Sequence, residues 1–207
     1  MLEFGRSLRR LRRLNGIKQE HLAELAGVTQ ATVSRWESGR HRPTPEQAAR
    51  LLPLLEARLN PAGDAMLKRL VETSALRVHL VCDVSHRLLA VSQGRRREWE
   101  NDAHDLYGET LWPFASDGIR DGEARLGDLG WYEPVARPVA GWTDFKHSGV
   151  IRMGPGMWLW ERVRLSDGGF ARMVTTLPLE DLRRGVPEAR IVSLPPGAPT
   201  GAEEPVV

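Results

Sequence analysis

Two side chains with planar hydrogen-bonding groups, Gln30 and Arg35, stand five positions apart in a stretch with helical spacing. A glutamine amide can bond N6 and N7 of adenine together, and an arginine guanidinium can bond O6 and N7 of guanine. Their neighbours Ala31 and Thr32 offer methyl groups that suit thymine, whereas the Ser34 hydroxyl reads bases ambiguously. This set predicts contacts with base edges, provided that a helix carries it into a major groove.

A second set of residues, on either side of that stretch, carries groups that bind phosphate. Phosphate contacts position a protein on DNA but do not distinguish one base sequence from another. Its members are Lys18, Gln19, Arg40, His41 and Arg42. Residues 1–60 carry a net charge of +5 and residues 61–207 a net charge of −3, which indicates a polyanionic partner for the first third alone. Charge by itself fits a solvated basic surface equally well, so the spacing of the elements has to decide.

The elements that would position these side chains are two short helices joined by a tight turn. Such a pair needs a small residue where the helices cross, and Ala23 stands there. It needs a turn residue free to take positive φ, which is Gly27. Val28 and Val33 supply the apolar contacts that hold the helices near a right angle. The spacing therefore predicts a helix-turn-helix.

Helical periodicity continues on both sides of this pair. A first helix ends at Asn15-Gly16, and Thr44-Pro45 begins a further helix that runs to about Leu55, which Pro53 should bend or shorten. Another helix, or a helical linker, is expected from Ala65 to about Ser74. The N-terminal part is thus expected to be all-α.

This stretch resembles the Cro/cI-repressor (XRE) helix-turn-helix family over about residues 4–59. The residues that carry the resemblance are Gly5, Leu8, Arg12, Gln19, Leu22, Ala23, Gly27, Val28, Val33, Ser34, Trp36, Glu37 and Gly39. The resemblance implies a five-helix DNA-binding domain in which Arg12 pairs with Glu37, while Gln19 binds a phosphate and supports Gln30. Independently of the resemblance, the helical spacing from Thr29 to Ser38 carries Trp36 inward, so core packing is expected for it and not base stacking.

The pattern becomes strand-like after residue 76. Two short strands, a helical middle over 95–130 and a terminal hairpin around Asp167-Gly168-Gly169 are expected. This order of elements resembles a PAS-type sensor domain, so the predicted fold is α+β with an antiparallel sheet in the second domain. The expected organisation is a DNA-binding domain over 1–59, a helical linker over 60–75, a PAS-like domain over 76–182 and a disordered tail over 183–207.

Aromatic residues in the second domain define a possible ligand pocket. They are Trp112, Phe114, Trp131, Trp142 and Phe145. An ordinary tryptophan-rich core explains them equally well, and no specific cofactor is expected. Single, scattered histidines argue against haem, and Cys82 lacks the motif of flavin-thiol photosensors. The absence of cysteine pairs and of metal-ligand spacing argues against a metal site.

Two functions remain open. The first is a DNA-binding transcriptional regulator, a homodimer on an inverted repeat, whose second domain senses a small molecule or dimerises. The second is a DNA-bound adaptor or antitoxin-type protein whose second domain docks a protein partner without a ligand. Enzymatic self-cleavage is not expected, because Lys146, the only lysine after Lys68, lacks a serine nucleophile at a suitable distance. No apolar run could span a bilayer, and a cytoplasmic location is expected.

The dimer contact is expected within residues 61–180. The apolar residues that we expect their own domain to leave uncovered are Met66, Leu67, Leu70 and Val71, together with Trp158 and Trp160 on a strand that is apolar on both faces.

Overall fold

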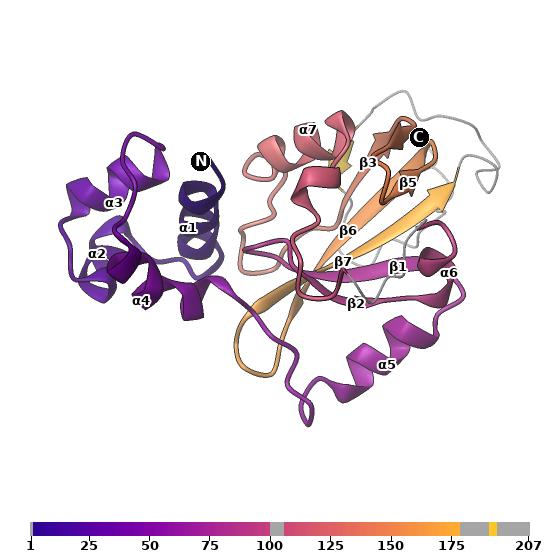
Figure 1. The fold of residues 1–207 in the computed structure, drawn as a ribbon, viewed down its shortest axis with the longest axis horizontal. Helices are drawn as coiled ribbons and strands as arrows, with labels where there is room; N and C mark the ends of the chain where they lie inside the picture. The colour runs from indigo at the N-terminus through magenta and orange to yellow at the C-terminus, as the bar shows by residue number, and fades with distance from the viewer. Residues whose placement is uncertain (1, 100–105, 179–190, 194–207) are drawn as a thin grey trace, which may run out of the picture.

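The computed structural model describes residues 2–99, 106–178 and 191–193 (Figure 1). Its N-terminal part consists of α1 (Leu2–Leu14), α2 (Gln19–Ala26), α3 (Gln30–Glu37) and α4 (Pro45–Leu55). The four helices pack around Leu8, Leu22, Val33, Trp36 and Leu51, each at most 1% exposed. We call α1–α4 the helical domain and the segment from α5 (Ala65–Thr73) to β8 (Ile191–Ser193) the sheet domain.

Local sequence signals set the helix ends in the helical domain. Gly27 closes α2 with φ of 66°, a left-handed conformation that glycine adopts easily. Thr29 caps α3 by accepting a bond from the N–H of Thr32, and Thr44 forms a capping box with Gln47 at the start of α4. The turn predicted at Gly27 and the helix start predicted at Thr44-Pro45 are confirmed.

The fifth helix expected in the helical domain lies elsewhere. Residues 2–59, all of which the structure describes, form four helices. Helix α5 (Ala65–Thr73) packs against strands β1 (Arg77–Cys82) and β2 (Leu88–Val91) (Figure 1). Val71 on α5 is buried, while Met66 and Leu70 are exposed. Apolar spacing predicted this helix correctly but did not say which domain its apolar face would meet.

The sheet domain is built on a six-stranded antiparallel sheet. Its strands are β1 (Arg77–Cys82), β2 (Leu88–Val91), β3 (Val139–Thr143), β6 (Gly156–Arg164), β7 (Phe170–Pro178) and β8 (Ile191–Ser193), in the order β2-β1-β7-β6-β3-β8. The connections contain α6 (Gln93–Arg96), the 3-10 helix η2 (Trp112–Phe114), α7 (Asp117–Arg125) and the small hairpin β4 (Lys146–His147)–β5 (Arg152–Met153). The α+β class and the antiparallel sheet are confirmed.

The tail predicted over 183–207 includes one ordered element. Ile191–Ser193 forms β8 and pairs with Val139–Gly141 of β3. The tail prediction is therefore wrong for these three residues, because backbone pairing with an open sheet edge stabilises even a short segment. The rest of that predicted tail, 183–190 and 194–207, lies outside the described residues.

Trp158 and Trp160 are buried within their own domain, which corrects the expectation that they supply spare apolar surface. Their rings stack with centroids 3.9 Å apart, and they are 1% and 2% exposed. Helix α7 covers them at Gly122, where a Cβ atom would lie 2.6 Å from the Trp158 ring. The glycine therefore allows the helix to approach closely enough to cover both tryptophans.

Candidate DNA-reading helix and sensor cavity

The crossing of α1 over the end of α3 depends on Gly5. A Cβ atom at this position would lie 2.1 Å from the carbonyl oxygen of Trp36, so any larger residue would push the helices apart. Ala23 and Val33 are buried where α2 meets α3. The predicted small and apolar positions thus fix how α3 sits on the domain.

Side chains predicted to contact bases lie on the outer side of α3. Gln30, Ala31 and Arg35 are exposed, and Thr32 and Ser34 are half-buried. Gln30 and Ser34, like Ala31 and Arg35, are four positions apart and therefore neighbours on one helix face. Thr32 differs from these four residues because its hydroxyl contacts the helix cap, where it lies 2.9 Å from the Thr29 hydroxyl.

A chain of hydrogen bonds fixes Gln30. The Arg12 guanidinium donates to both carboxylate oxygens of Glu37, from Nε at 2.8 Å and from Nη2 at 3.1 Å. Gln19 Nε2 donates to the same carboxylate at 2.9 Å, and its Oε1 accepts from Gln30 Nε2 at 2.6 Å. The geometry contains both the Arg12–Glu37 pair and the Gln19–Gln30 contact that the family resemblance implied.

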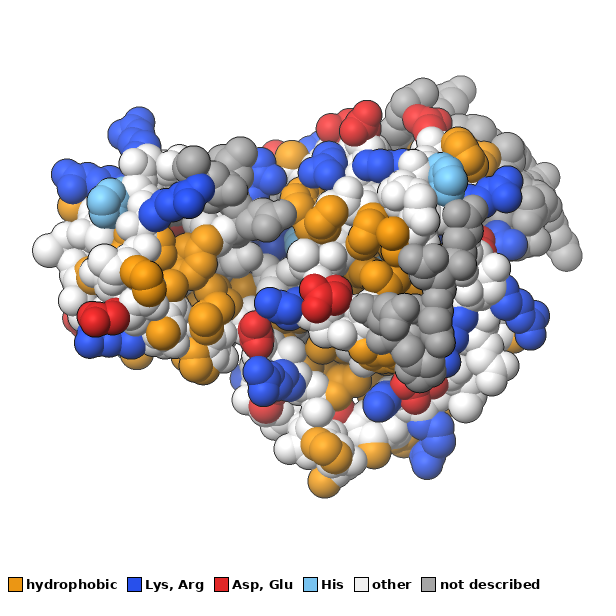
Figure 2. Space-filling model, in the orientation of Figure 1, with side chains coloured by type: hydrophobic (Ala, Val, Ile, Leu, Met, Phe, Trp, Pro, Cys, Tyr) orange, Lys and Arg blue, Asp and Glu red, His pale blue; other side chains and the backbone are white. Residues whose placement is uncertain are grey.

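The predicted phosphate-binding side chains lie close to this helix in sequence and are open to solvent. Lys18, Arg40, His41 and Arg42 are exposed, and Gln19 is half-buried. Lys18 provides no side-chain cap for α2, so the first N–H groups of that helix stay available to an anion. Figure 2 shows several Lys and Arg side chains over the end of the molecule formed by α2 and α3.

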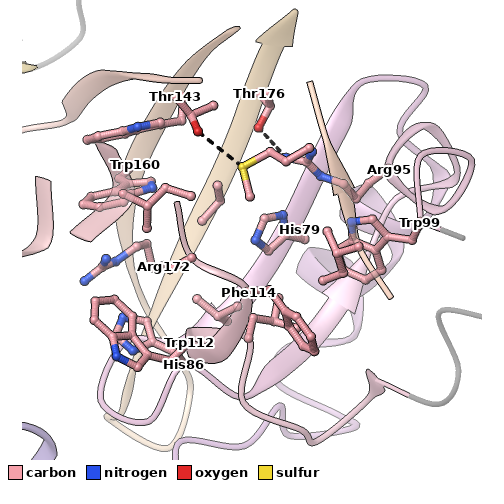
Figure 3. A pocket seen from close by; sticks show the side chains of 18 residues that line it. His79, His86, Arg95, Trp99, Trp112, Phe114, Thr143, Trp160, Arg172 and Thr176 are labelled. Atoms are coloured by element: carbon pink, nitrogen blue, oxygen red, sulfur yellow. Dashed lines mark hydrogen bonds between the residues drawn. The ribbon is translucent and has the colours of Figure 1, made fainter. Parts of the chain in front are cut away.

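A cavity of about 90 Å³ lies on the face of the sheet that also carries the stacked tryptophans (Figure 3). Of the predicted pocket residues, Trp112 and Phe114 line it. The other three lie elsewhere: Trp131 donates to Asp83, Trp142 donates to Asp144, and Phe145 is 58% exposed. The structure thus places two of the five aromatic residues, both in η2, at the cavity and the other three away from it, because composition does not reveal the direction of a side chain.

Several residues that sequence reasoning missed line the same cavity. They are His79, Arg95, Trp99, Trp160, Arg172 and Thr176. Arg95 is buried because α6 lies close to the preceding chain, where a Cβ on Gly94 would meet the Ala75 carbonyl at 2.2 Å. Its neighbour Arg97 is exposed, so nothing in the run of arginines from 95 to 97 indicated which one turns inward.

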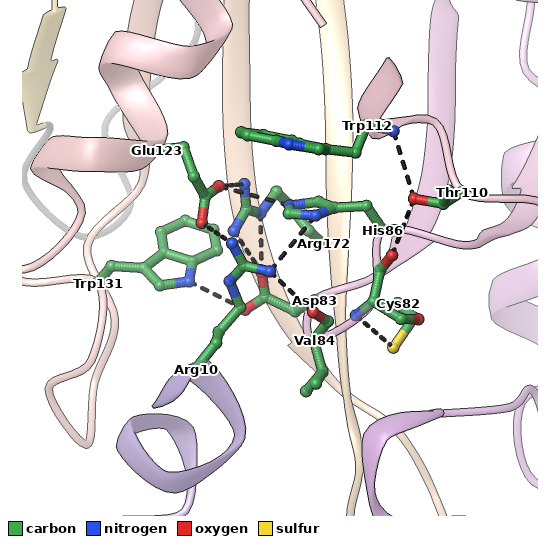
Figure 4. Close-up of polar contacts among 11 residues, drawn as sticks. Arg10, Cys82, Asp83, Val84, His86, Thr110, Trp112, Glu123, Trp131 and Arg172 are labelled. Carbon is green, nitrogen blue, oxygen red and sulfur yellow. Dashed lines mark hydrogen bonds and ion pairs between the residues drawn. The ribbon is translucent and has the colours of Figure 1, made fainter. Parts of the chain in front are cut away.

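A buried cluster of charges begins at Arg172 in the wall of the cavity and continues into the helical domain (Figure 4). Arg172 donates to Asp83 from Nε at 2.8 Å and to Glu123 from Nη1 at 2.7 Å. Glu123 also pairs with Arg10 of α1, whose Nη1 donates to the carbonyl of Val84 at 2.8 Å. The wall of the cavity and the first helix of the helical domain thus share a carboxylate.

His86 links this cluster to the aromatic lining. Its ring stacks on Trp112 at 5.0 Å, and its Nδ1 lies 3.4 Å from Arg10 Nη1. Burial and the Arg10 cation lower the pKa of His86 to about 4, so its imidazole is neutral near pH 7. Burial would raise the pKa of Glu123, but Arg10 and Arg172 hold that pKa well below its ordinary value.

Comparison with known protein families supports the helix-turn-helix prediction for the helical domain. Residues 3–60 match a family model described as a helix-turn-helix domain, and none of the curated proteins matches the chain significantly. The N-terminal part of this protein is therefore a helix-turn-helix domain, the class of domain that binds DNA. Within the described residues, no helix combines the length and apolarity that crossing a bilayer requires.

Solved structures similar to this chain include that of an RNA-binding Light-Oxygen-Voltage receptor. The two chains are 8% identical with a TM-score of 0.42, over 87% of this chain and 61% of the receptor chain. This chain thus spans less than two thirds of the receptor's length. The PAS-like order of elements predicted for the second domain, two strands, a helical middle and a terminal hairpin, is present in the structure.

Proposed function

We propose that this protein is a sequence-specific transcriptional regulator that reads base edges with α3. The main support for this proposal is the chain of hydrogen bonds that ends on Gln30. The amide nitrogen of Gln30 has two hydrogens, and its bond to Gln19 uses one. One N–H and the amide oxygen remain, which is the pair that adenine N7 and N6 require. Gln30 is thus oriented in advance without losing its capacity to read a base.

The rest of the interface follows from what α3 leaves exposed. Arg35 is available for guanine and Ala31 for a thymine methyl group, with Thr32 and Ser34 in supporting positions. Lys18, Gln19, Arg40, His41 and Arg42 would hold the phosphates on either side of the groove. The proposed role is binding, in the cytoplasm, with no catalytic step.

We further propose that the protein acts as a homodimer on an inverted repeat. One helix-turn-helix domain makes too few base contacts to specify a single site, so such domains pair on half-sites about one helical turn apart. Met66 and Leu70 on α5 are 66% and 62% exposed, and Leu76 follows at 58%. This apolar strip on the sheet domain supports an interface formed by the region after residue 60.

The sheet domain is proposed to sense a small molecule. Its cavity is lined mainly by apolar and aromatic side chains with a few polar groups, which is the usual composition of a ligand site. The charge cluster supports this role, since residues of the cavity wall reach α1 through Glu123. A ligand that shifts this wall would therefore change how the helix-turn-helix domain is held.

The test of DNA reading is selection from a randomised operator library with the full chain. Gln30→Ala should relax the preference at one base position and weaken the best site by ~1–3 kcal/mol, whereas Arg42→Ala should weaken all sequences alike. Arg97→Ala, an exposed arginine of the sheet domain outside α5, is the control and should bind as wild type does. If Gln30→Ala lowers affinity equally for every sequence, the assignment of α3 as the base-reading helix is wrong.

A further inference from the structure

A cleft with a volume of about 220 Å³ lies between the helical domain and the sheet domain. One wall comes from α1 and the end of α4, and the other from the turn between β1 and β2 and from the region of η2. We call it the interdomain cleft, and its lining includes Phe4, Arg6, Arg10, Leu52, Glu56 and Ser85. It differs from the sheet-domain cavity, which lies within one domain, although His86 and Trp112 line both.

The lining of the interdomain cleft includes hydrogen-bond donors without partners. Arg10 is 7% exposed, and its Nε has no hydrogen-bond partner among the described residues, whereas its Nη1 and Nη2 both donate. The hydroxyl of Ser85 is also buried without a partner there. Figure 4 shows Arg10 extending from α1 toward His86, at the boundary of the two domains. Since both unpartnered groups can donate, an occupant that satisfies them has to bring acceptors.

The lining also carries one positive charge that its ion pairs leave unbalanced. Glu56 Oε1 pairs with Arg87 Nε at 3.2 Å, and the buried cluster around Arg10 is neutral because it holds two guanidinium groups and two carboxylates. Arg6 is exposed, and no ion pair joins it to another side chain that the structure describes. His86 adds no charge near pH 7, because its pKa is about 4. The charge of the lining therefore suits an occupant with a single negative charge.

Apolar side chains lie beside these donors in the helical wall of the cleft. Leu52 on α4 is 47% exposed, whereas Leu55, one turn further along, is buried. Phe4 on α1 is half-buried. The apolar surface that Leu52 leaves in water would be covered by an apolar group in the cleft, which contributes about 25 cal/mol for each Å² removed from water. An occupant thus needs an apolar part as well as an anionic one.

The volume and the aromatic lining set the shape of the apolar part. An apolar cavity of ~150 Å³ holds benzene, so a cleft of about 220 Å³ has room for about six carbons and a carboxylate. The Trp112 ring already stacks on His86 at 5.0 Å and has the Arg120 guanidinium 5.0 Å from its centroid, so little of its surface remains for a second ring. An aliphatic chain needs no such surface. A second negative charge is disfavoured, because the Glu56 carboxylate lines the same cleft.

We propose that the interdomain cleft binds a small aliphatic monocarboxylate. Its carboxylate lies against the guanidinium of Arg6, the Nε–H of Arg10 and the hydroxyl of Ser85, and its alkyl chain lies against Phe4 and Leu52. Because the two walls belong to different domains, the occupant contacts both domains at once, and its binding stabilises their association. This site is separate from the sheet-domain cavity and depends neither on a ligand there nor on DNA reading.

Calorimetric titration of the full-length protein with hexanoate, hexanamide and acetate tests this assignment. Hexanoate should bind several-fold more tightly than hexanamide, which has the same chain without the charge, because the hydrogen bonds to the guanidinium groups lose their charge assistance. Hexanoate should also bind more tightly than acetate, which has the charge without the chain, because acetate leaves Leu52 uncovered.

Two matched pairs of variants locate the ligand, and all four substitutions are at exposed positions. Arg6→Gln should weaken hexanoate several-fold and leave hexanamide nearly unchanged, whereas Arg9→Gln, on the same helix but outside the lining, should bind hexanoate normally. Leu52→Ala should weaken hexanoate and hexanamide alike. Leu54→Ala, at a leucine of α4 that is 42% exposed and also outside the lining, should change neither affinity.

Each contrary result overturns a stated part of the proposal. If hexanamide binds as tightly as hexanoate, the carboxylate assignment is wrong, and if acetate equals hexanoate, the assignment of an aliphatic chain is wrong. If hexanoate binds wild type, Arg6→Gln and Leu52→Ala equally well, the ligand occupies another site and the cleft assignment is wrong. If none of the three compounds binds while the same preparation selects its operator from the library, the ligand class is overturned and the DNA-reading proposal stands.

Discussion

Arg10 on α1 and Glu123 on α7 form an ion pair across the boundary between the helix-turn-helix domain and the sheet domain. Both side chains are nearly buried, at 8% and 10% exposure. Three residues further along α1, the Arg13 guanidinium lies 3.9 Å from the ring centroid of Tyr132, so a second arginine joins the domains. The helix-turn-helix domain is thus attached to the sheet domain, beside the wall of its cavity, by these side-chain contacts and not only by the connecting chain.

Breaking the Arg10–Glu123 pair should uncouple the domains. Arg10→Gln leaves Glu123 with one cation fewer in a buried site, and we expect a loss of roughly 3–5 kcal/mol of stability. Calorimetry should then show the helical domain melting before the sheet domain. Arg9→Gln, an exposed neighbour on α1, should melt as wild type does. An unchanged single transition for Arg10→Gln would contradict the proposed coupling.

The Arg12–Glu37 pair should stabilise the helix-turn-helix domain more than an exposed pair would. The side chains are 21% and 5% exposed, and the bond is bidentate. Arg12→Ala should cost roughly 1.5–3 kcal/mol, the usual contribution of hydrogen bonds to charged groups. Denaturant melts of Arg12→Ala, Glu37→Ala and the double variant measure the pair as a coupling energy. A coupling energy of zero would mean that the pair contributes nothing in solution.

Gln19 should influence base preference mainly through Gln30. Removing its side chain in Gln19→Ala frees the Gln30 amide, which then loses orientational restraint. We expect reduced discrimination at the position that Gln30 reads, and a smaller effect of Gln19→Ala when Gln30 is already alanine. A double-mutant cycle on operator affinity measures this coupling. Additive effects of the two substitutions would show that Gln19 acts on a phosphate alone.

His86 should make stability fall between about pH 6.5 and pH 4. Its pKa is about 4 in the folded chain and about 6.5 when unfolded, so between these values the unfolded chain binds a proton that the folded chain does not. Stability is therefore complete above the unfolded pKa and decreases by roughly 1.4 kcal/mol for each pH unit below it. Chemical denaturation as a function of pH should show a shallower slope for His86→Gln. An identical slope would mean that a group other than His86 takes up the proton on unfolding.

Dimer formation should depend on the exposed strip of α5. Met66→Asp and Leu70→Asp place charges in a surface that we expect to be buried between two copies, and they should give a monomer by light scattering at micromolar concentration. Leu52→Asp on α4, where the leucine is 47% exposed, is the control and should leave the dimer intact. A fragment that ends after Leu59 should be mostly monomeric. A dimer that survives both α5 variants would place the interface elsewhere, with the apolar residues of α4 as the first alternative.

The helix-turn-helix was predictable from the sequence because its determinants are local. Gly27, Thr29 and the apolar positions at Ala23 and Val33 act within a few residues of one another, so spacing alone specifies the turn and the buried side of each helix. Once the buried side of α3 is known, its other residues are the ones that face outward. The same local signals predicted the β6–β7 hairpin, where Gly168 has φ of 86°.

Only the tertiary structure decided which charged and aromatic residues are inside. Arg10, Arg95 and Arg172 are buried by contacts with residues distant along the chain, and nothing in their immediate sequence distinguishes them from exposed arginines such as Arg97. Trp131 lies against the charge cluster, whereas Trp112 lines the cavity. Periodicity tells which side of an element is apolar, but not what that side meets, because packing between distant segments is settled by the whole core. The cavity and its link to α1 therefore emerge only when the sheet, α7 and α1 are brought together.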